Sequence, residues 1–292
     1  MNKQRDLLVL KFLWEFKVAT TAMLYERFFS DVKHRTAYNC LLRLKKQKLI
    51  GIRTTQNGIC PVWELTKMGL KEVVNLIPPL SSKVTSSENH VHDLLVTSIH
   101  LGPFIKGAPK DLEFISEQKL RSVDNSLLPH YVFSPKEHRP DGYWYIQDSK
   151  KLRLMALEVE LHQKAKKLYE EVSFFYSDFK ESDRCIWIVK KQSVARTILR
   201  SMYKTRPDYY IHNFLLLKDI LKLGWNAPII IGPDKFDTLY SLFDQSLQSN
   251  DRPSPDHMFI KYLLDNRLSY ENHSVLEMKE LFSRVNCIGV SL

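Results

Sequence analysis

The sequence has few cysteines, and their arrangement fits neither a zinc site nor a disulfide framework. Its 292 residues include four cysteines, widely separated and never in a C-x-x-C pair: Cys40, Cys60, Cys185 and Cys287. Zinc sites and small disulfide-linked domains both need cysteines clustered at short, regular spacings. The pattern therefore excludes these two classes and indicates thiols that stay reduced, as in the cytoplasm.

Glycine and long apolar runs are also scarce. The chain has 9 glycines, and none of them forms the glycine-rich loop that cradles a phosphate group. No apolar run approaches the ~20 residues of a membrane span, and the first residues are too charged for a signal peptide. We therefore expect a soluble, cytoplasmic protein with no membrane partner and no nucleotide-binding loop.

Apolar and charged residues occur in ordinary globular proportions. The chain is 44% hydrophobic and 26% charged, with a formal net charge of +10. This length and composition allow a sizeable core and favour two domains. The positive charge fits a polyanionic partner such as nucleic acid.

Residues 1–77 have the pattern of a winged helix-turn-helix domain. Helices are expected over 5–16, 20–29 and 33–48, then a hairpin over 49–65 and a helix from Thr66. Thr20 is the expected N-cap of the second helix, and Asn57-Gly58 marks the hairpin turn. The order resembles winged helices, in which the third helix enters the major groove and the wing rests on the DNA backbone.

The expected third helix and the wing carry the candidates for DNA contact. They are Lys33, His34, Arg35, Thr36, Asn39 and Arg43 on the helix, with Arg53 and Gln56 on the wing. A wing-type module can also serve protein contacts, and this alternative stays open.

A Pro/Ser/Thr-rich stretch over residues 78–87 predicts a linker to a second domain. That domain is expected to span residues 88–247 and to be followed by a helical extension over 248–292. Strands are expected over 112–121, 141–146, 154–161, 184–189 and 209–217, and helices from Glu88 and over 163–179, 193–203 and 234–247. The helix over 163–179 is expected to turn Leu168, Val172, Phe175 and Phe179 inward.

Acidic residues lie at the ends of two adjacent expected strands. Asp141 opens the first, and Glu158 and Glu160 lie two residues apart on the second, so a pleated strand points both to one face. Converging carboxylates suit a hard divalent cation, and two like charges this close should raise the pKa of one of them. A half-exposed strand that alternates Glu with Val gives the same pattern, so a purely structural reading stays open.

Pro140-Asp141 followed by Glu158-Val159-Glu160 resembles the proline-aspartate/(Asp or Glu)-x-Lys nuclease core of restriction endonucleases and resolvases. Glu160 stands where that core usually has Lys. The resemblance implies an α/β nuclease-like domain in which Asp141, Glu158 and the Val159 carbonyl hold Mg²⁺ or Mn²⁺. It further implies that Glu160 or a nearby group activates the attacking water.

Two other residues are catalytic candidates. Lys164, on the helix after the acidic strand, is placed to supply the positive charge that the missing Lys would bring. Lys167 on the same helix is a second source of this charge, and a solvated helix face is the alternative role of both lysines. His92, next to Asp93, borders the apolar stripe of the helix from Glu88. Tyr169 and Tyr176 follow the acidic strand at helical spacing, and we interpret both as core residues.

In combination, the winged helix, His92-Asp93-Leu94-Leu95, Arg139-Pro140-Asp141 and Ala156–Glu160 resemble the replication-relaxation family. That family is similar to the mobilisation-protein-C relaxases. The resemblance implies a metal-dependent protein that nicks duplex DNA at a plasmid or mobile-element origin, as a monomer or a homodimer. The alternative, suggested by Glu160, is a transcriptional or copy-number regulator with an inactive nuclease-like domain.

Overall fold

A computed structural model of the chain describes residues 3–54, 61–74, 89–100, 107, 112–121, 138–147, 152–178, 184–205, 211–232 and 238–243. It confirms a mixed α/β fold. Gln56, the turn at Asn57-Gly58, the expected linker, Glu88 and the extension over 248–292 lie outside these residues. The chain divides into unit 1 (residues 1–101, 118–129 and 273–292) and unit 2 (residues 102–117 and 130–272), and each is described by itself.

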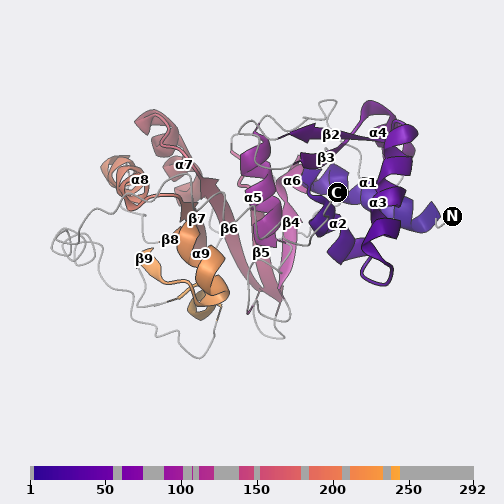
Figure 1. The fold of residues 1–292 in the computed structure, drawn as a ribbon. Coiled ribbons are helices and arrows are strands. Elements are labelled where there is room, and N and C mark those ends of the chain that lie inside the picture. The colour runs from indigo at the N-terminus through magenta and orange to yellow at the C-terminus, as the bar shows by residue number, and fades with distance from the viewer. Residues whose placement is uncertain are drawn as a thin grey trace. The chain divides into compact units, whose positions relative to one another are not determined.

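Unit 1 contains helices and a three-stranded antiparallel sheet (Figure 1). Its elements are α1 (Lys3–Phe16), β1 (Val18–Ala19), α2 (Thr21–Phe28), α3 (His34–Lys46), β2 (Ile50–Thr54), β3 (Pro61–Leu65) and α4 (Lys67–Val73), with strand order β1-β3-β2. Thr20 caps α2 as expected, since its Oγ1 accepts a hydrogen bond from the Met23 N–H at 3.2 Å. The sequence does not predict β1, because two residues are too few to show a period.

The start of α4 is fixed tightly beside β2. Thr66 Oγ1 accepts a hydrogen bond from the Gly69 N–H at 3.0 Å and donates one to the Leu49 carbonyl at 2.9 Å. A Cβ on Gly69 would lie 2.0 Å from that same carbonyl. Only glycine therefore allows the helix to approach this closely.

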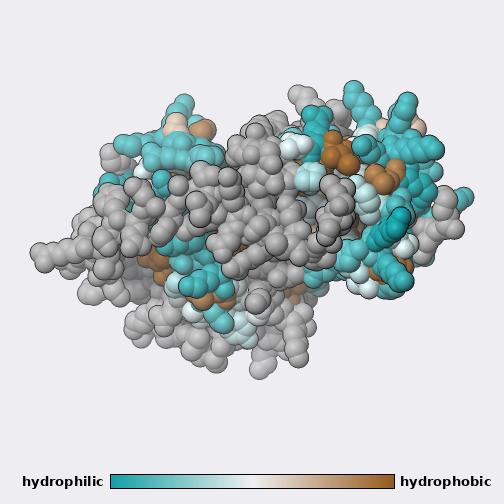
Figure 2. Space-filling view, in the orientation of Figure 1, coloured by the Kyte–Doolittle hydropathy of each residue, from teal (hydrophilic) through white to brown (hydrophobic). Residues whose placement is uncertain are grey.

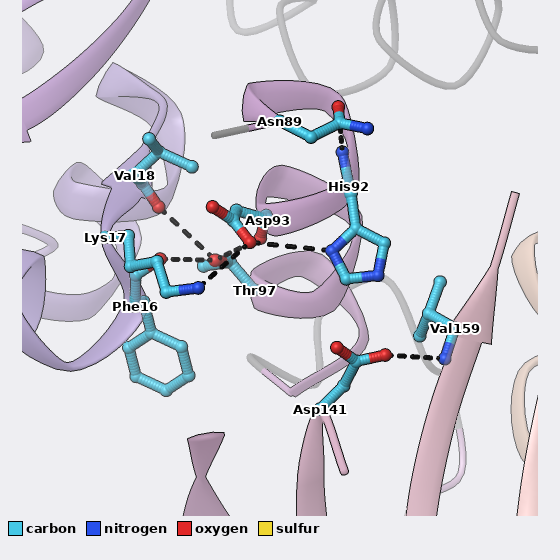
Figure 3. Close-up of polar contacts among 9 residues, drawn as sticks. All are labelled: Phe16, Lys17, Val18, Asn89, His92, Asp93, Thr97, Asp141 and Val159. Carbon is cyan, nitrogen blue, oxygen red and sulfur yellow. Dashed lines mark hydrogen bonds and ion pairs between the residues drawn. The ribbon is translucent and has the colours of Figure 1, made fainter. Parts of the chain in front are cut away.

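Helix α5 (His90–His100) packs in unit 1 against α1 and β1. Its buried Asp93 has one carboxylate oxygen 3.4 Å from Lys17 Nζ, and Thr97 Oγ1 donates to the Val18 carbonyl at 3.3 Å (Figure 3). The sequence pattern assigns this helix to the second domain. The structure places it with the first 74 residues instead, because both its apolar face and its buried carboxylate find their partners there.

Unit 2 is built on a six-stranded mixed sheet (Figure 1). In spatial order the strands are β4 (Glu113–Ser116), β5 (Gly142–Gln147), β6 (Leu152–Glu160), β7 (Arg184–Val189), β8 (His212–Leu216) and β9 (Ile229–Ile231). β4, β5 and β6 are antiparallel, β6, β7 and β8 are parallel, and β9 is antiparallel to β8. Within the described ranges, no helix combines the length and the apolar character that a bilayer span needs.

Two helices connect the parallel strands, α7 (Lys166–Asp178) and α8 (Gln192–Thr205). They pack against each other. This contact follows from topology, because successive right-handed crossovers that advance in one direction place their helices on one face of the sheet. On another part of the sheet, Trp144 packs against Trp225 with ring centroids 5.0 Å apart, and Trp225 packs against Phe243 at 5.0 Å.

Several elements differ from the expected ones. The strand expected over 112–121 ends at Ser116, and Glu117–Leu120 forms the short helix α6; the expectation is wrong because alternation cannot distinguish a strand from one helical turn. The strand expected over 209–217 ends at Leu216, where α9 (Leu217–Leu223) begins. In the helix expected over 234–247, the described residues Tyr240–Leu242 form a 3-10 turn.

The buried face of α7 is also rotated from the expected one. Leu168, expected to point inward, is 46% exposed. Tyr169, Ser173 and Tyr176 are buried instead. The two tyrosines are therefore core residues, as expected.

Candidate functional site: an acidic cluster at the ends of two strands

Asp141 lies where β5 begins and is bound to β6 by both its backbone and its side chain. Its N–H donates to the Leu157 carbonyl at 2.9 Å, and its Oδ2 accepts a hydrogen bond from the Val159 N–H at 2.7 Å (Figure 3). The antiparallel register of the two strands stops at Gly142, opposite Leu157. The Asp141 carboxylate thus takes the place of the next backbone acceptor in the ladder.

The residue after Asp141 must be glycine. A Cβ on Gly142 would lie 2.3 Å from the ring of Phe114 and 2.7 Å from the Ile115 carbonyl, both on β4. Because β4 and β5 approach this closely, the beginning of β5 is held in place from both sides. The position of Asp141 at the end of β6 follows from this packing.

Glu158 is a buried carboxylate held by two donors from different parts of the chain. It is 8% exposed, and its Oε1 lies 2.6 Å from both the Tyr176 hydroxyl of α7 and His138 Nε2. The His138 ring also packs against Phe175, with centroids 5.2 Å apart. Both contacts engage the same oxygen, so they fix the orientation of the carboxylate and leave Oε2 out of these two bonds.

The pair between His138 and Glu158 changes the titration of the imidazole. Burial lowers the pKa of His138, but the charge of Glu158 and the hydrogen bond to it outweigh burial and raise the pKa overall. The charge of Asp141 acts in the same direction. His138 therefore holds a proton more readily than an isolated histidine.

Glu160 is paired with Lys164. Its side chain is 6% exposed, and its Oε2 lies 2.9 Å from Lys164 Nζ. Burial raises the pKa of Glu160, the lysine opposes this, and the charge of Glu158 adds to the rise. The raised pKa agrees with the expectation that two neighbouring glutamates raise the pKa of one of them, although burial contributes more to the rise than the charge of Glu158 does.

Lys164 is the cation of this cluster, as the sequence suggests. Burial lowers the pKa of Lys164, but the hydrogen bond to Glu160 and the charges of Glu160, Glu158 and Asp141 raise it overall. Lys167 differs, since its ammonium lies 3.9 Å from Glu171 on a solvated face of α7. We therefore define the acidic cluster as His138, Asp141, Glu158, Glu160 and Lys164.

The donor atoms of the acidic cluster suit a hard divalent cation. The protein binds Asp141 at Oδ2 and Glu158 at Oε1. The N–H and C=O of a strand residue face the same edge, so the Val159 carbonyl faces the β5 side with its N–H. Within the part of the chain that the structure describes, no group of three or more His, Cys, Asp or Glu side chains is arranged to hold a metal ion. A Mg²⁺ ion bound by two carboxylates would keep most of its water and substrate ligands, which is usual for Mg²⁺.

His92 belongs to unit 1 and is described apart from this cluster. Its Nδ1 lies 3.5 Å from Asp93 Oδ1, and its backbone N–H donates to Asn89 Oδ1 at 3.2 Å (Figure 3). A role for His92 at the carboxylates of unit 2 stays a prediction.

The sequence pattern does not predict that His138 and Tyr176 bind the Glu158 carboxylate. His138 lies three residues before Asp141, and this proximity is the one signal that could have drawn attention to it. Tyr176 is a core residue whose hydroxyl also binds Glu158, 18 residues away in the chain. That pairing depends on how α7 lies against β6 and leaves no trace in the spacing.

The candidates for DNA contact in unit 1 fall into two groups. Lys33, Arg35, Thr36 and Asn39 are exposed on or beside α3. The other three described candidates have partners inside the unit: His34 stacks on Tyr25 at 3.5 Å, Arg43 binds Asp6 at 2.6 Å, and Arg53 binds Glu64 at 2.6 Å. The exposed group is therefore the one whose side chains are available to a ligand.

Comparisons of the chain with protein-family models, with curated proteins and with solved structures each found no match.

Proposed function

We propose that the protein binds duplex DNA through unit 1 and nicks it, with the help of a divalent cation, at the acidic cluster of unit 2. The observation that carries the proposal is the pair Asp141 and Glu158 at adjoining strand ends, each with one carboxylate oxygen fixed by the protein. The resemblance in sequence to relaxases suggests a plasmid or mobile-element origin as the place of action.

The topology of both units supports this proposal. In unit 1, the order α1, β1, α2, α3, β2, β3 is the order of a winged helix, with exposed cations on α3. In unit 2, three antiparallel strands, a helix and a parallel strand follow one another as in restriction-endonuclease-like cores. Because a fold does not by itself specify a function, the argument depends on the cluster.

The proposed chemistry assigns a role to each charged group of the cluster. A bound Mg²⁺ or Mn²⁺ would neutralise charge on the phosphoryl oxygens and lower the pKa of its water. Asp141 and Glu158 would hold the ion, and His138 orients Glu158. Glu160, whose pKa burial raises, is placed to accept a proton from the attacking water, and Lys164 compensates the negative charge.

The test is a nicking assay on supercoiled plasmid that carries candidate origins, with Mg²⁺, Mn²⁺ or chelator. Replacing Asp141 by Ala should slow nicking by at least about 100-fold, since a charge-stabilising group is lost. DNA affinity should stay nearly unchanged, because α3 lies in the other unit. The matched control is Glu171→Ala, which removes an exposed carboxylate of α7; if both variants nick at the wild-type rate, the assignment is wrong.

A DNA-binding regulator with an inactive second unit is a second candidate. The observation that favours it is charge compensation within the chain: Glu158 is bound by His138 and Tyr176, and Glu160 by Lys164. A carboxylate that already has donors needs no ion to be stable in a buried site. Tight DNA binding with no nicking in any divalent metal would support this function.

A further inference from the structure

A cationic segment without acidic residues forms β7, α8 and the residues just after them. Seven Lys and Arg residues and no Asp or Glu lie between positions 184 and 207: Arg184, Lys190, Lys191, Arg196, Arg200, Lys204 and Arg206. The chain as a whole has 33 acidic residues, so a stretch of this length normally contains two or three. The predicted winged helix and the predicted nuclease core assign no DNA contact or catalytic role to the cations of this segment.

The structure places part of this charge on one outer face. α8 buries Val194, Ala195, Ile198, Leu199 and Met202. Arg200 is exposed on the opposite face, and Lys191 is exposed in the turn between β7 and α8, with Lys190 half-buried beside it. Figure 2 shows hydrophilic side chains over the α7–α8 side of unit 2.

Lys190 and Lys191 lie at the same strand ends as the acidic cluster, where β7 ends. The Lys190 N–H donates to the Glu160 carbonyl at 3.4 Å, which joins the end of β7 to the end of β6. Thr197 of α8 also donates to Gln163 Oε1 at 3.4 Å, in the connection that leads from Glu160 to α7. Lys164, which binds Glu160, comes from that same connection.

We propose that Lys190, Lys191 and Arg200, here called the β7–α8 surface, bind the phosphate backbone of duplex DNA. The inference rests on the proposed function and adds a second contact site, in unit 2, to the one on α3. Charge complementarity identifies the occupant, because cations with no acidic neighbour in their segment attract a polyanion. Binding of this kind is independent of base sequence, since phosphate contacts carry no sequence information directly.

Two DNA-binding surfaces in one chain give a bivalent protein. Once one surface is bound, the other meets the DNA at a high effective concentration, so the whole chain binds more tightly than either surface alone. The α3 site would select the DNA, and the β7–α8 surface would hold the backbone beside Asp141 and Glu158. Loss of the second surface should therefore weaken nicking more than it weakens site selection.

The experiment measures the salt dependence of binding of the full chain to a short duplex of arbitrary sequence by fluorescence anisotropy. The variant is Lys190→Ala with Lys191→Ala. Its control is Lys218→Ala with Lys222→Ala, which removes two exposed lysines from α9 of the same unit. Each lost phosphate contact lowers the magnitude of the slope of log K against log salt concentration by about 0.9. Measured between roughly 50 and 200 mM salt, the slope of the variant should therefore be smaller by about two units. The slope of the control should equal that of wild type.

A third variant, Lys33→Ala with Arg35→Ala, removes two exposed cations of the α3 site and separates this inference from the proposed function. If the α3 variant loses slope while the β7–α8 variant behaves as its control does, only unit 1 contacts DNA and the inference is overturned. If neither variant differs from wild type, binding of DNA by either surface is refuted. Loss of slope in the β7–α8 variant alone or in both variants supports the second surface.

Discussion

Glu158 is the residue at which the packing of unit 2 and its proposed chemistry meet. A buried carboxylate destabilises a fold unless hydrogen bonds compensate for the lost water. His138 and Tyr176 provide that compensation at one oxygen, each at 2.6 Å. The same two contacts also orient the carboxylate, so stability and function depend on one arrangement.

The raised pKa of His138 makes a prediction about stability and pH. Because the folded protein binds this proton more tightly than the unfolded chain, the interaction stabilises the fold fully below the ordinary pKa of 6.5. The contribution is then lost as the pH rises through the raised value. In His138→Gln, the melting temperature should fall most against wild type near about pH 6 and least near about pH 9.

The measurement is thermal unfolding of both proteins across that pH range. His90→Gln is the control, since His90 lies in unit 1, where its Nε2 is 3.7 Å from Glu64. Two parallel curves for wild type and His138→Gln would show that the imidazole and the carboxylate are not coupled.

At the scale of elements, Tyr176 joins α7 to β6 through a hydrogen bond from its hydroxyl to the Glu158 carboxylate. Tyr176→Phe keeps the ring packing and removes only the hydroxyl. A hydrogen bond to a charged group contributes about 1.5–3 kcal/mol to stability, so the free energy of unfolding measured in urea should fall by that amount. The Mg²⁺ concentration for half-maximal nicking should also rise about 10-fold, because a residue that orients a metal ligand is lost.

Tyr145→Phe is the matched control for this change. Tyr145 is a buried tyrosine of β5 whose hydroxyl donates to Glu113, a carboxylate outside the acidic cluster. The Tyr145→Phe variant should be less stable than wild type but should need the same Mg²⁺ concentration for half-maximal nicking. An equal shift in both variants would mean that the hydroxyl of Tyr176 acts through stability alone.

The long elements could be predicted from the sequence, and the short ones could not. α1, α2 and α3 have apolar spacing over enough residues to define a period, and β7 contains a continuous apolar run that begins and ends beside charged residues. β1, α6, α9 and β9 are two to seven residues long, so their form depends on neighbours that the sequence does not name. Leu168 and Tyr169 show the same limit within α7, since a small rotation of the helix decides which of them is buried.

The candidate site was predictable to a similar degree. The spacing of Asp141, Glu158 and Glu160 identifies the carboxylates and the strand ends that carry them. Lys164 is near Glu160 in the chain and could be predicted, but His138 and Tyr176 lie 20 and 18 residues from Glu158. Arg43 is a similar case, since it binds Asp6 from 37 residues away. A sequence shows that Arg43 is cationic, but only the packing of α1 against α3 shows that an acidic residue of unit 1 binds it.

At the scale of the whole molecule, the two units divide the proposed function between them. Unit 1 presents exposed cations on α3, and unit 2 presents the acidic cluster and the β7–α8 surface. α5 belongs with unit 1, so the unit that we propose to bind DNA is larger than the pattern over residues 1–77 indicates. Of the two proposed ligands, DNA should therefore stabilise both units, whereas the divalent cation should stabilise unit 2 alone.

Hydrogen exchange measured by mass spectrometry tests this division. A ligand at 100 times its dissociation constant stabilises the state that binds it by about 2.7 kcal/mol. Hydrogen exchange that requires this state to open should then be about 100-fold slower. Mg²⁺ should slow exchange in β5 and β6 and leave α3 unchanged, whereas duplex DNA should slow it in α3. In Glu158→Gln the effect of Mg²⁺ should disappear while the effect of DNA on α3 remains. Protection of β5 and β6 by Mg²⁺ that persists in Glu158→Gln would place the ion elsewhere, because an amide at this position has lost the charge that holds it.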